Sequence, residues 1–205
     1  MLSAAGDPER ARQMAAYLRG QFPFYGVTST ERRQLTRPIL KTHAQADLRE
    51  LWAHPQREVH YCACEHAEMH GASLPTLEYL ITTKSWWDTV DTLASHSVGK
   101  LVLKHPELHE TMDAWSQADN MWLRRTSLIY QLSYKNQTDE ARLFRNVERL
   151  AHEQEFFIRK AIGWALRQYA RVAPEAVSDF LRKNKHQLSG LSWREATKHL
   201  PALRG

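Results

Sequence analysis

The sequence contains little cysteine and has no long run of apolar residues. Two of its 205 residues are cysteine, too few for a disulfide framework, and this count favours a reducing compartment. No stretch approaches the roughly 20 consecutive apolar residues that a membrane span needs, and the mean hydropathy is −0.58. The N-terminus lacks a basic segment followed by an apolar one, so we expect no signal peptide. We therefore expect a soluble intracellular protein without a membrane partner.

Glycine and proline are also scarce, at eight residues each, and strand-like alternation is nearly absent. Apolar residues recur instead at helical spacing, with proline near the segment ends. We expect helices at about 8–20, 30–42, 46–54, 56–71, 74–83, 85–103, 107–116, 120–134, 138–151, 155–172, 174–184 and 192–203. About a dozen helices with short links predict an all-α fold and one domain over residues 1–205. A four-helix bundle cannot hold so many helices, whereas an α-solenoid of HEAT-like repeats can.

Several helix starts carry capping signals. Asp7 precedes a proline at the first helical position. The segments 28–31 and 192–195 match capping boxes, and 85–88 resembles one with aspartate in place of glutamate. Asp119 is the expected cap of the helix at 120–134.

The segment 156–171 has two different faces when it is drawn as a helix. One is an ordinary core stripe: Ile158, Ile162, Ala165, Leu166, Tyr169 and Val172. The opposite face interleaves aromatic and basic side chains: Phe157, Lys160, Trp164, Arg167 and Arg171. Such a face suits a nucleic-acid backbone and its bases. The alternative is a solvated basic face whose tryptophan covers a neighbouring helix.

Two further helices carry candidate residues. In 85–99, Trp86, Val90, Leu93 and Ser97 form a core-facing row, and Trp87 and Asp91 form a separate pair one turn apart. In 119–134, Arg125 lies near Trp122, with Leu128, Ile129 and Leu132 expected in the core. Asp91 could be part of a site or simply exposed. Arg125 could be a snorkelling surface residue or a phosphate clamp.

The common phosphate-loop, dinucleotide and hydrolase motifs are absent from the sequence. The segment 60–70 contains His60, Cys62, Cys64, His66 and His70, and of these Cys62, His66 and His70 could share one side of a helix. A closed zinc site normally needs a fourth ligand from another segment, and no other segment offers one at a suitable spacing. We therefore expect no metal and no other cofactor, and we interpret the cysteines as small buried side chains.

Six segments resemble the DNA alkylation repair glycosylases of the AlkD type. The signature is 83–91 (TKSWWDTVD), followed by 103–108 (LKHPEL), 120–125 (NMWLRR) and 155–167 (EFFIRKAIGWALR). The segments 22–27 (FPFYGV) and 194–199 (REATKH) extend the resemblance over nearly the whole chain. One departure is Thr30, where the family tends to have proline.

The resemblance implies a right-handed superhelix of HEAT-like repeats whose concave basic groove holds duplex DNA. It implies a monofunctional glycosylase that removes N3- and N7-alkylated purines, such as 3-methyladenine and 7-methylguanine, during base excision repair. It assigns the catalytic carboxylate to Asp91 and the cleft tryptophans to Trp87 and Trp164. The remaining DNA-binding positions that it implies are Arg125, Lys160, Arg167, Phe156, Phe157 and Tyr17.

The resemblance also implies a monomer that acts on alkylated double-stranded DNA in the cytoplasm, in a bacterium the cytosol or nucleoid. The rival hypothesis is a non-catalytic HEAT-like scaffold that binds nucleic acid or protein. Such a scaffold would explain the helices and the net charge of +5, but it gives no reason for Trp87 and Asp91 to lie together.

Overall fold

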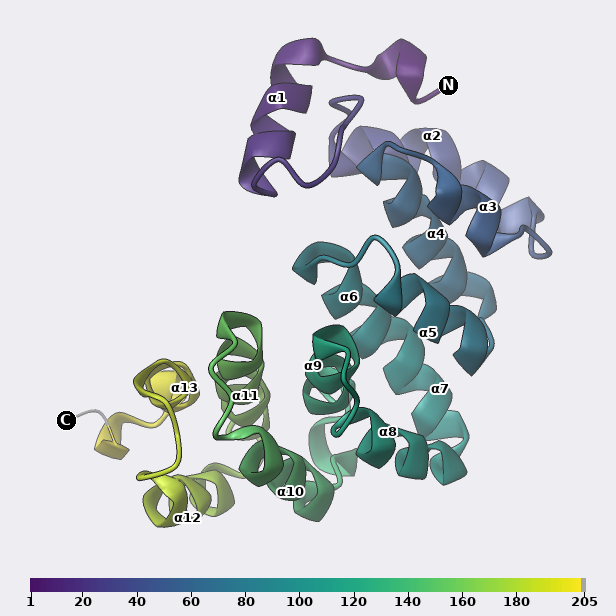
Figure 1. Ribbon diagram of the computed structural model, residues 1–205. Helices are drawn as coiled ribbons and strands as arrows, with labels where there is room; N and C mark the ends of the chain where they lie inside the picture. Colours follow the sequence, from purple (N-terminus) through teal and green to yellow (C-terminus); the bar gives the residue numbers. More distant parts are fainter. Residues whose placement is uncertain (204–205) are drawn as a thin grey trace. The chain divides into compact units, whose positions relative to one another are not determined.

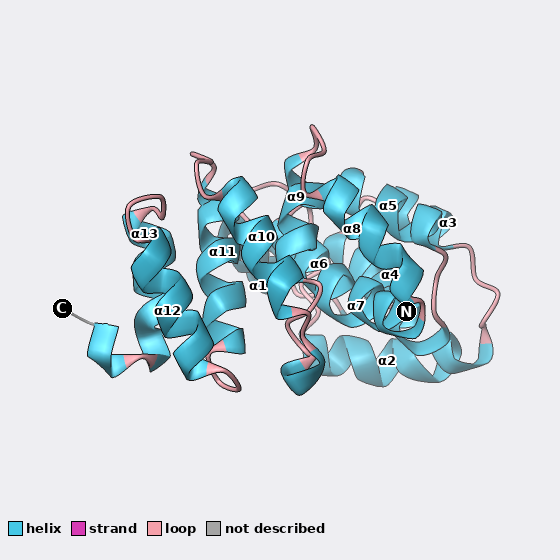
Figure 2. Cartoon of the chain, turned by 90° about the horizontal axis from the view of Figure 1, so that it is seen from below, coloured by secondary structure: helices cyan, strands magenta, loops and turns pink. Residues whose placement is uncertain are grey.

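The computed structural model describes residues 1–203, and every regular element in that range is helical. Figure 1 follows the helices along the chain, and Figure 2 shows the same chain without any strand among these residues. None of the described helices is long and apolar enough to cross a membrane. The predicted all-α fold, an α-solenoid of stacked helices, is confirmed. The superhelical shape and its concave basic groove stay predictions.

The chain divides into two compact units, Met1–Leu80 and Ile81–Gly205, and we describe each by itself. The first contains η1 (Ser3–Ala5), α1 (Pro8–Tyr17), α2 (Ser29–Thr42), α3 (Leu48–Ala53), α4 (Arg57–His70) and most of α5 (Leu74–Thr82). Within it, α4 packs against both α2 and α3. Trp52 of α3 is buried and contacts His60 of α4, with ring centroids 4.8 Å apart. The prediction of a single domain stays a prediction.

Two predicted caps hold in the first unit. Asp7 accepts a hydrogen bond from the Arg10 backbone N–H, with Pro8 as the first helical residue. Thr28 and Glu31 form a complete capping box at the start of α2. Thr30 lies exposed in the first turn of α2, a position where a proline would also be tolerated.

The loop at 22–27 is held by one buried carboxylate. Glu58 accepts hydrogen bonds from the backbone N–H groups of Tyr25, Gly26 and Val27, at 3.0, 2.8 and 3.1 Å. Gly26 has φ +88°, and a Cβ there would lie 2.0 Å from the Asp7 carbonyl oxygen. A glycine is therefore required where this loop crosses the start of α1.

The second unit contains the helices that carry most of the predicted site. They are α6 (Trp87–Thr92), the π-helix η2 (Leu93–Val98), α7 (Gly99–Lys104), η3 (Pro106–Leu108), α8 (His109–Trp115), α9 (Met121–Ile129), η4 (Lys135–Gln137), α10 (Glu140–Leu150), α11 (Phe156–Tyr169), α12 (Pro174–Asn184), α13 (Gly190–Ala196), η5 (Thr197–His199) and η6 (Pro201–Leu203). Because α6, η2 and α7 follow one another without a break, they form the single helix predicted at 85–103. A π-helix, with its i→i+5 hydrogen bonds, interrupts that helix in the middle.

Three predicted helix starts in this unit are wrong. Trp86 is the N-cap of α6, and Ser85 instead donates its hydroxyl to the Ile81 carbonyl at 2.6 Å. Asn120, not Asp119, caps α9. Ser189 caps α13, so the segment 192–195 lies inside that helix. In each case a neighbouring residue has the extended backbone that a cap requires.

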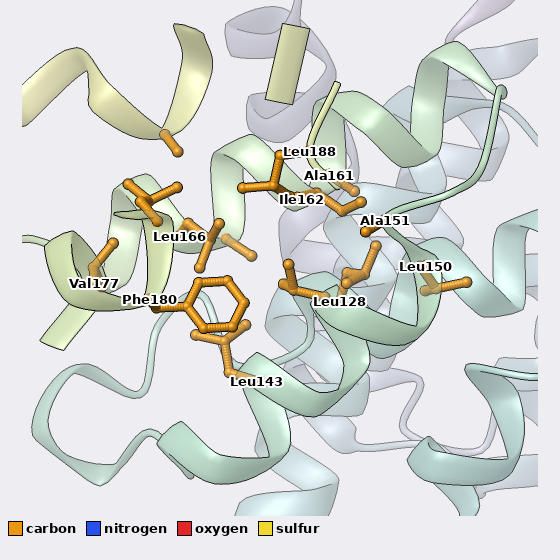
Figure 3. Packing of buried hydrophobic residues seen from close by; sticks show 14 of the residues in the cluster. Leu128, Leu143, Leu150, Ala151, Ala161, Ile162, Leu166, Val177, Phe180 and Leu188 are labelled. Carbon is orange, nitrogen blue, oxygen red and sulfur yellow. The ribbon is translucent and has the colours of Figure 1, made fainter. Parts of the chain in front are cut away.

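The core of the second unit lies between α9, α10, α11 and α12 (Figure 3). Ile158, Ile162 and Leu166 of α11 are fully buried, and Ala165 is 5% exposed. The predicted core stripe ends there, because Val172 lies past the end of α11 and is 39% exposed. Tyr169 is half-buried and donates its hydroxyl to Glu140.

Helix α13 packs closely against α11 at a glycine. A Cβ on Gly163 would lie 2.4 Å from the Cβ of Glu195 and 2.8 Å from the Ser192 carbonyl oxygen. The Ser192 hydroxyl also donates to the Arg159 carbonyl at 2.9 Å. The absence of a side chain at position 163 therefore sets the distance between the two helices.

This contact predicts the effect of Gly163→Ala. Helix propensity alone would stabilise the variant by about 1 kcal/mol. Overpacking against α13 costs about 1–3 kcal/mol, and here it includes a backbone oxygen that cannot move aside. We expect a net loss in the free energy of unfolding, measured by urea denaturation. Gly190→Ala is the control, because a Cβ there meets only the flexible end of Arg194 at 3.2 Å; equal stability of the two variants would contradict the expectation.

Candidate functional site

Asp91 lies in the last turn of α6, one turn after Trp87 and two residues before the π-helical segment. Its side chain is 16% exposed. Val90 and Leu93 beside it are fully buried and Ser97 is 7% exposed, so these three confirm the predicted core-facing row. The Ser95 hydroxyl donates to the Asp91 carbonyl at 2.7 Å. The carboxylate is therefore mostly withdrawn from solvent on a well-fixed backbone.

The carboxylate of Asp91 is held by Arg125 from α9. Arg125 Nε donates to Oδ1 at 2.7 Å and Nη2 donates to Oδ2 at 2.8 Å, which is the strong bidentate geometry. Arg125 Nη1 donates to the Phe157 carbonyl of α11. The ion pair thus ties α6, α9 and α11 together.

The structure excludes one of the two alternatives that the sequence left open for Arg125. It is only 4% exposed, so it is not a snorkelling surface residue. Its guanidinium faces Asp91 and the Phe157 carbonyl. In this conformation the direct partner of Arg125 is the carboxylate, and its implied contact with DNA stays a prediction.

Burial and the ion pair act in opposite directions on Asp91. Burial is the larger effect and raises the pKa of Asp91 above the ordinary value of 3.8, while the hydrogen bonds and charge of Arg125 lower it. Without Arg125, the desolvated carboxyl group would have a still higher pKa.

An aromatic cluster lies beside this ion pair. Trp86, Trp122 and Phe157 have ring centroids 5.1–6.0 Å apart. The Arg125 guanidinium lies 5.9 Å from the centroid of Phe157. Trp86, predicted as a core residue, is half-buried and packs against Trp122 of α9 and Phe157 of α11.

Two more predicted residues meet at one carboxylate on α13. Lys160 and Arg167 of α11 contact Glu195 at 2.7 and 2.5 Å, and Lys198 contacts it at 2.8 Å. Trp164 lies on the same face of α11, is half-buried and packs against the core. The basic face predicted on α11 is therefore joined to a neighbouring helix by ion pairs. Arg171 lies further along, with its Nη2 at 3.3 Å from Nε2 of His199.

The other predicted site residues have different environments. Trp87 is half-buried at the first position of α6, and Phe156 is 51% exposed at the first position of α11. Tyr17 ends α1 in the first unit and is 73% exposed. Their contacts with DNA stay predictions.

The histidines of α4 bind backbone carbonyl groups. Through Nε2, His60 contacts the His54 carbonyl, His66 the His43 carbonyl and His70 the Leu40 carbonyl, each at 2.8 Å. Cys62 is buried with Arg32 Nη1 3.8 Å away. Across residues 1–203, no three side chains of the metal-ligating types are grouped so that they could hold a metal ion.

The comparisons with known proteins identify the family. A family model described as "DNA alkylation repair enzyme" matches residues 1–200. The chain belongs to this family. A solved structure with the same fold is a "Predicted DNA alkylation repair enzyme from Enterococcus faecalis". It is 31% identical, with a TM-score of 0.87, over 96% of this chain and 97% of that one. No curated protein matches the chain.

Membership of the DNA alkylation repair enzyme family supports a role in DNA repair and binding to DNA. Within this family member, sequence reasoning missed the partner of Arg125, the cluster around Trp86 and the three-way contact of Glu195. Trp122, Glu195 and Lys198 all lie inside the segments 120–125 and 194–199, which resemble the glycosylase family, so the sequence did mark these regions. Periodicity within one helix cannot show which residues of another helix they meet.

Proposed function

We propose that the protein is a monomeric, monofunctional DNA glycosylase of base excision repair. It hydrolyses the N-glycosidic bond of positively charged N3- and N7-alkylated purines, such as 3-methyladenine and 7-methylguanine, in duplex DNA. The observation that carries the proposal is the largely buried carboxylate of Asp91, oriented by two hydrogen bonds from Arg125 and placed one turn after Trp87.

The chemistry of the substrate explains why one carboxylate suffices. Alkylation at N3 or N7 makes the purine cationic, so it leaves as a neutral base when the glycosidic bond takes its electron pair. No general acid is then needed. The deoxyribose becomes an oxocarbenium-like cation, and a water oxygen bonds to its C1′ and loses a proton.

Asp91 performs two tasks in this reaction. Its negative charge stabilises the developing cation, and a fixed carboxylate in a water-poor site does so better than a solvated one. Its oxygens also orient the attacking water and accept its proton. Both tasks require the ionised form, which Arg125 favours by lowering the pKa of Asp91 against the effect of burial.

The aromatic and basic side chains bind the substrate. Trp87 and Trp164 place aromatic faces against the cationic nucleotide, worth about 0.5–2 kcal/mol each. Lys160, Arg167 and Arg125 contact backbone phosphates, while Phe156, Phe157 and Tyr17 approach the strand. This division assigns affinity to phosphate contacts and the chemistry to Asp91.

Release of free base is the deciding experiment. Duplex DNA methylated with dimethyl sulfate is incubated with the protein and a chelator, and 7-methylguanine and 3-methyladenine are quantified by chromatography. We expect both bases from the methylated duplex and an abasic product without strand cleavage. Binding of DNA without any released base would support the scaffold hypothesis instead.

A further inference from the structure

We propose that Glu195 assembles a phosphate-binding site for the DNA backbone from Lys160, Arg167 and Lys198. Glu195 is the positioning residue, and Lys198 is a third DNA contact beside the two cations already considered. The inference rests on the proposed DNA-binding role of α11, and it explains why the segment at 194–199 carries both a glutamate and a lysine.

The packing of α13 on α11 sets the geometry. Gly163 allows the Glu195 Cβ to approach the α11 backbone, because any side chain at 163 would collide with it. Lys160 lies three residues before Gly163 and Arg167 lies four residues after it, so they flank that contact by one helical turn on each side. Lys198 is three residues after Glu195 on the neighbouring segment. The carboxylate therefore lies at the centre of cations from two segments.

The local charge favours an anionic ligand. Three cations surround one carboxylate, and among these four groups the net charge is +2. Glu195 is 9% exposed, whereas Lys160 and Lys198 are 40% and 49% exposed. The carboxylate is covered and the ammonium groups face solvent, as a site that receives a phosphate from outside requires.

Hydrogen-bonding capacity supports the same ligand. An ammonium group has three donors and a guanidinium has five, and each cation donates one hydrogen bond to Glu195. The remaining donors are available for phosphate oxygens or water. Lys160 and Arg167 lie four residues before and three residues after Trp164 on α11, so a bound phosphate would lie beside one of the two tryptophans proposed to contact the nucleotide.

Glu195 stays charged throughout the range in which the protein would work. The hydrogen bonds and charges of Lys160 and Lys198 outweigh the opposing effect of burial and lower the pKa of Glu195 to about 2. The carboxylate therefore holds the cations in place at any physiological pH.

The first test uses Lys198→Ala. Dissociation constants for undamaged duplex DNA are measured between 50 and 200 mM salt, and each lost phosphate contact lowers the slope of log K against log salt by about 1. We expect that loss for Lys198→Ala. Lys183→Ala removes the same charge from an exposed position on α12 and serves as the control. Identical slopes for the two variants would overturn the assignment of Lys198.

The second test separates positioning from simple charge. If Glu195 only neutralised its neighbours, Glu195→Gln would remove one negative charge, raise the net charge of the site by one and tighten DNA binding. If Glu195 assembles the site, the three cations repel one another and separate, so we expect binding at least about threefold weaker, with a lower salt slope. Circular dichroism verifies that the variant is folded. If it is not, Lys198→Ala still decides, since that side chain is half exposed.

Base release distinguishes this inference from the proposed function. Wild-type protein that releases methylated bases, together with a Lys198→Ala slope equal to that of wild type, rejects the phosphate site alone. Wild-type protein that shows the expected slopes but releases no base rejects the glycosylase assignment alone.

Discussion

Asp91→Asn is expected to lower the single-turnover rate of 7-methylguanine release about 10²–10³-fold. The substitution keeps the shape of the side chain but removes the negative charge that faces the developing oxocarbenium ion. Losing one preorganised electrostatic group costs about 3–4 kcal/mol in the transition state. The measurement uses enzyme in excess over methylated duplex, so that the rate reports chemistry. A rate within about threefold of wild type would remove Asp91 from the mechanism.

The structure predicts that Asp91→Asn also lowers the stability of the fold. From the sequence alone, an exposed helix-face aspartate could become asparagine without affecting folding. Asp91 instead neutralises Arg125, which is 4% exposed, and breaking a buried pair by removing one partner costs about 3–5 kcal/mol. The double variant Asp91→Asn/Arg125→Met removes both charges and is the matched control. It should recover part of the lost stability and remain as slow as the single variant.

Arg125→Met is expected to shift the pH dependence of base release to higher pH. The pKa of Asp91 is already raised by burial, and Arg125 is what lowers it. Removing that cation raises the pKa further, so the ionised carboxylate forms only at a higher pH, and activity on the acidic side falls. The same loss of a buried partner should lower the free energy of unfolding by about 3–5 kcal/mol. Profiles of kcat against pH, each with a denaturation curve, measure both effects.

Arg124→Met is the control for this experiment. Arg124 is next to Arg125 in α9 and contacts Glu153 at 2.6 Å, with 17% of its side chain exposed. The Arg124→Met variant loses a partly buried ion pair that does not involve Asp91. We therefore expect the acidic side of its profile of kcat against pH to match that of the wild type. If Arg125→Met instead lowers the salt slope of DNA binding by about 1 with an unchanged acidic limb, Arg125 acts on phosphate and not on Asp91.

The local features of the fold were predictable from the sequence, while the contacts between helices were not. Helical periodicity placed Ile158, Ile162 and Leu166 in the core and separated Lys160, Trp164 and Arg167 from them, and α11 has that division. The same reasoning treated Trp86 as an ordinary core residue, because spacing reports burial without reporting the neighbour. The cap errors at Ser85, Asp119 and Ser192 have a related cause, since several adjacent residues can cap and the local backbone selects one.

Ion pairs were the largest omission. Arg125 and Asp91 are 34 residues apart in the sequence, and Lys160 and Glu195 are 35 residues apart. A pattern within one segment cannot link residues that lie so far apart in the chain. The family resemblance named Asp91 and Arg125 but gave them separate roles. Burial makes the two charges depend on each other, because either one alone in that position would be unpaired and poorly solvated.

The π-helical segment after Asp91 sets the direction in which its carboxylate points. A π-helical turn contains one more residue than the corresponding α-helical turn, whereas each residue of an α-helix rotates it by about 100°. If the same residues, Leu93–Val98, were wound as a regular α-helix, the extra residue would rotate Asp91 by about a quarter turn relative to α7, away from Arg125. The wider turn absorbs that residue, so α6 presents Asp91 to α9 while α7 keeps its own packing face.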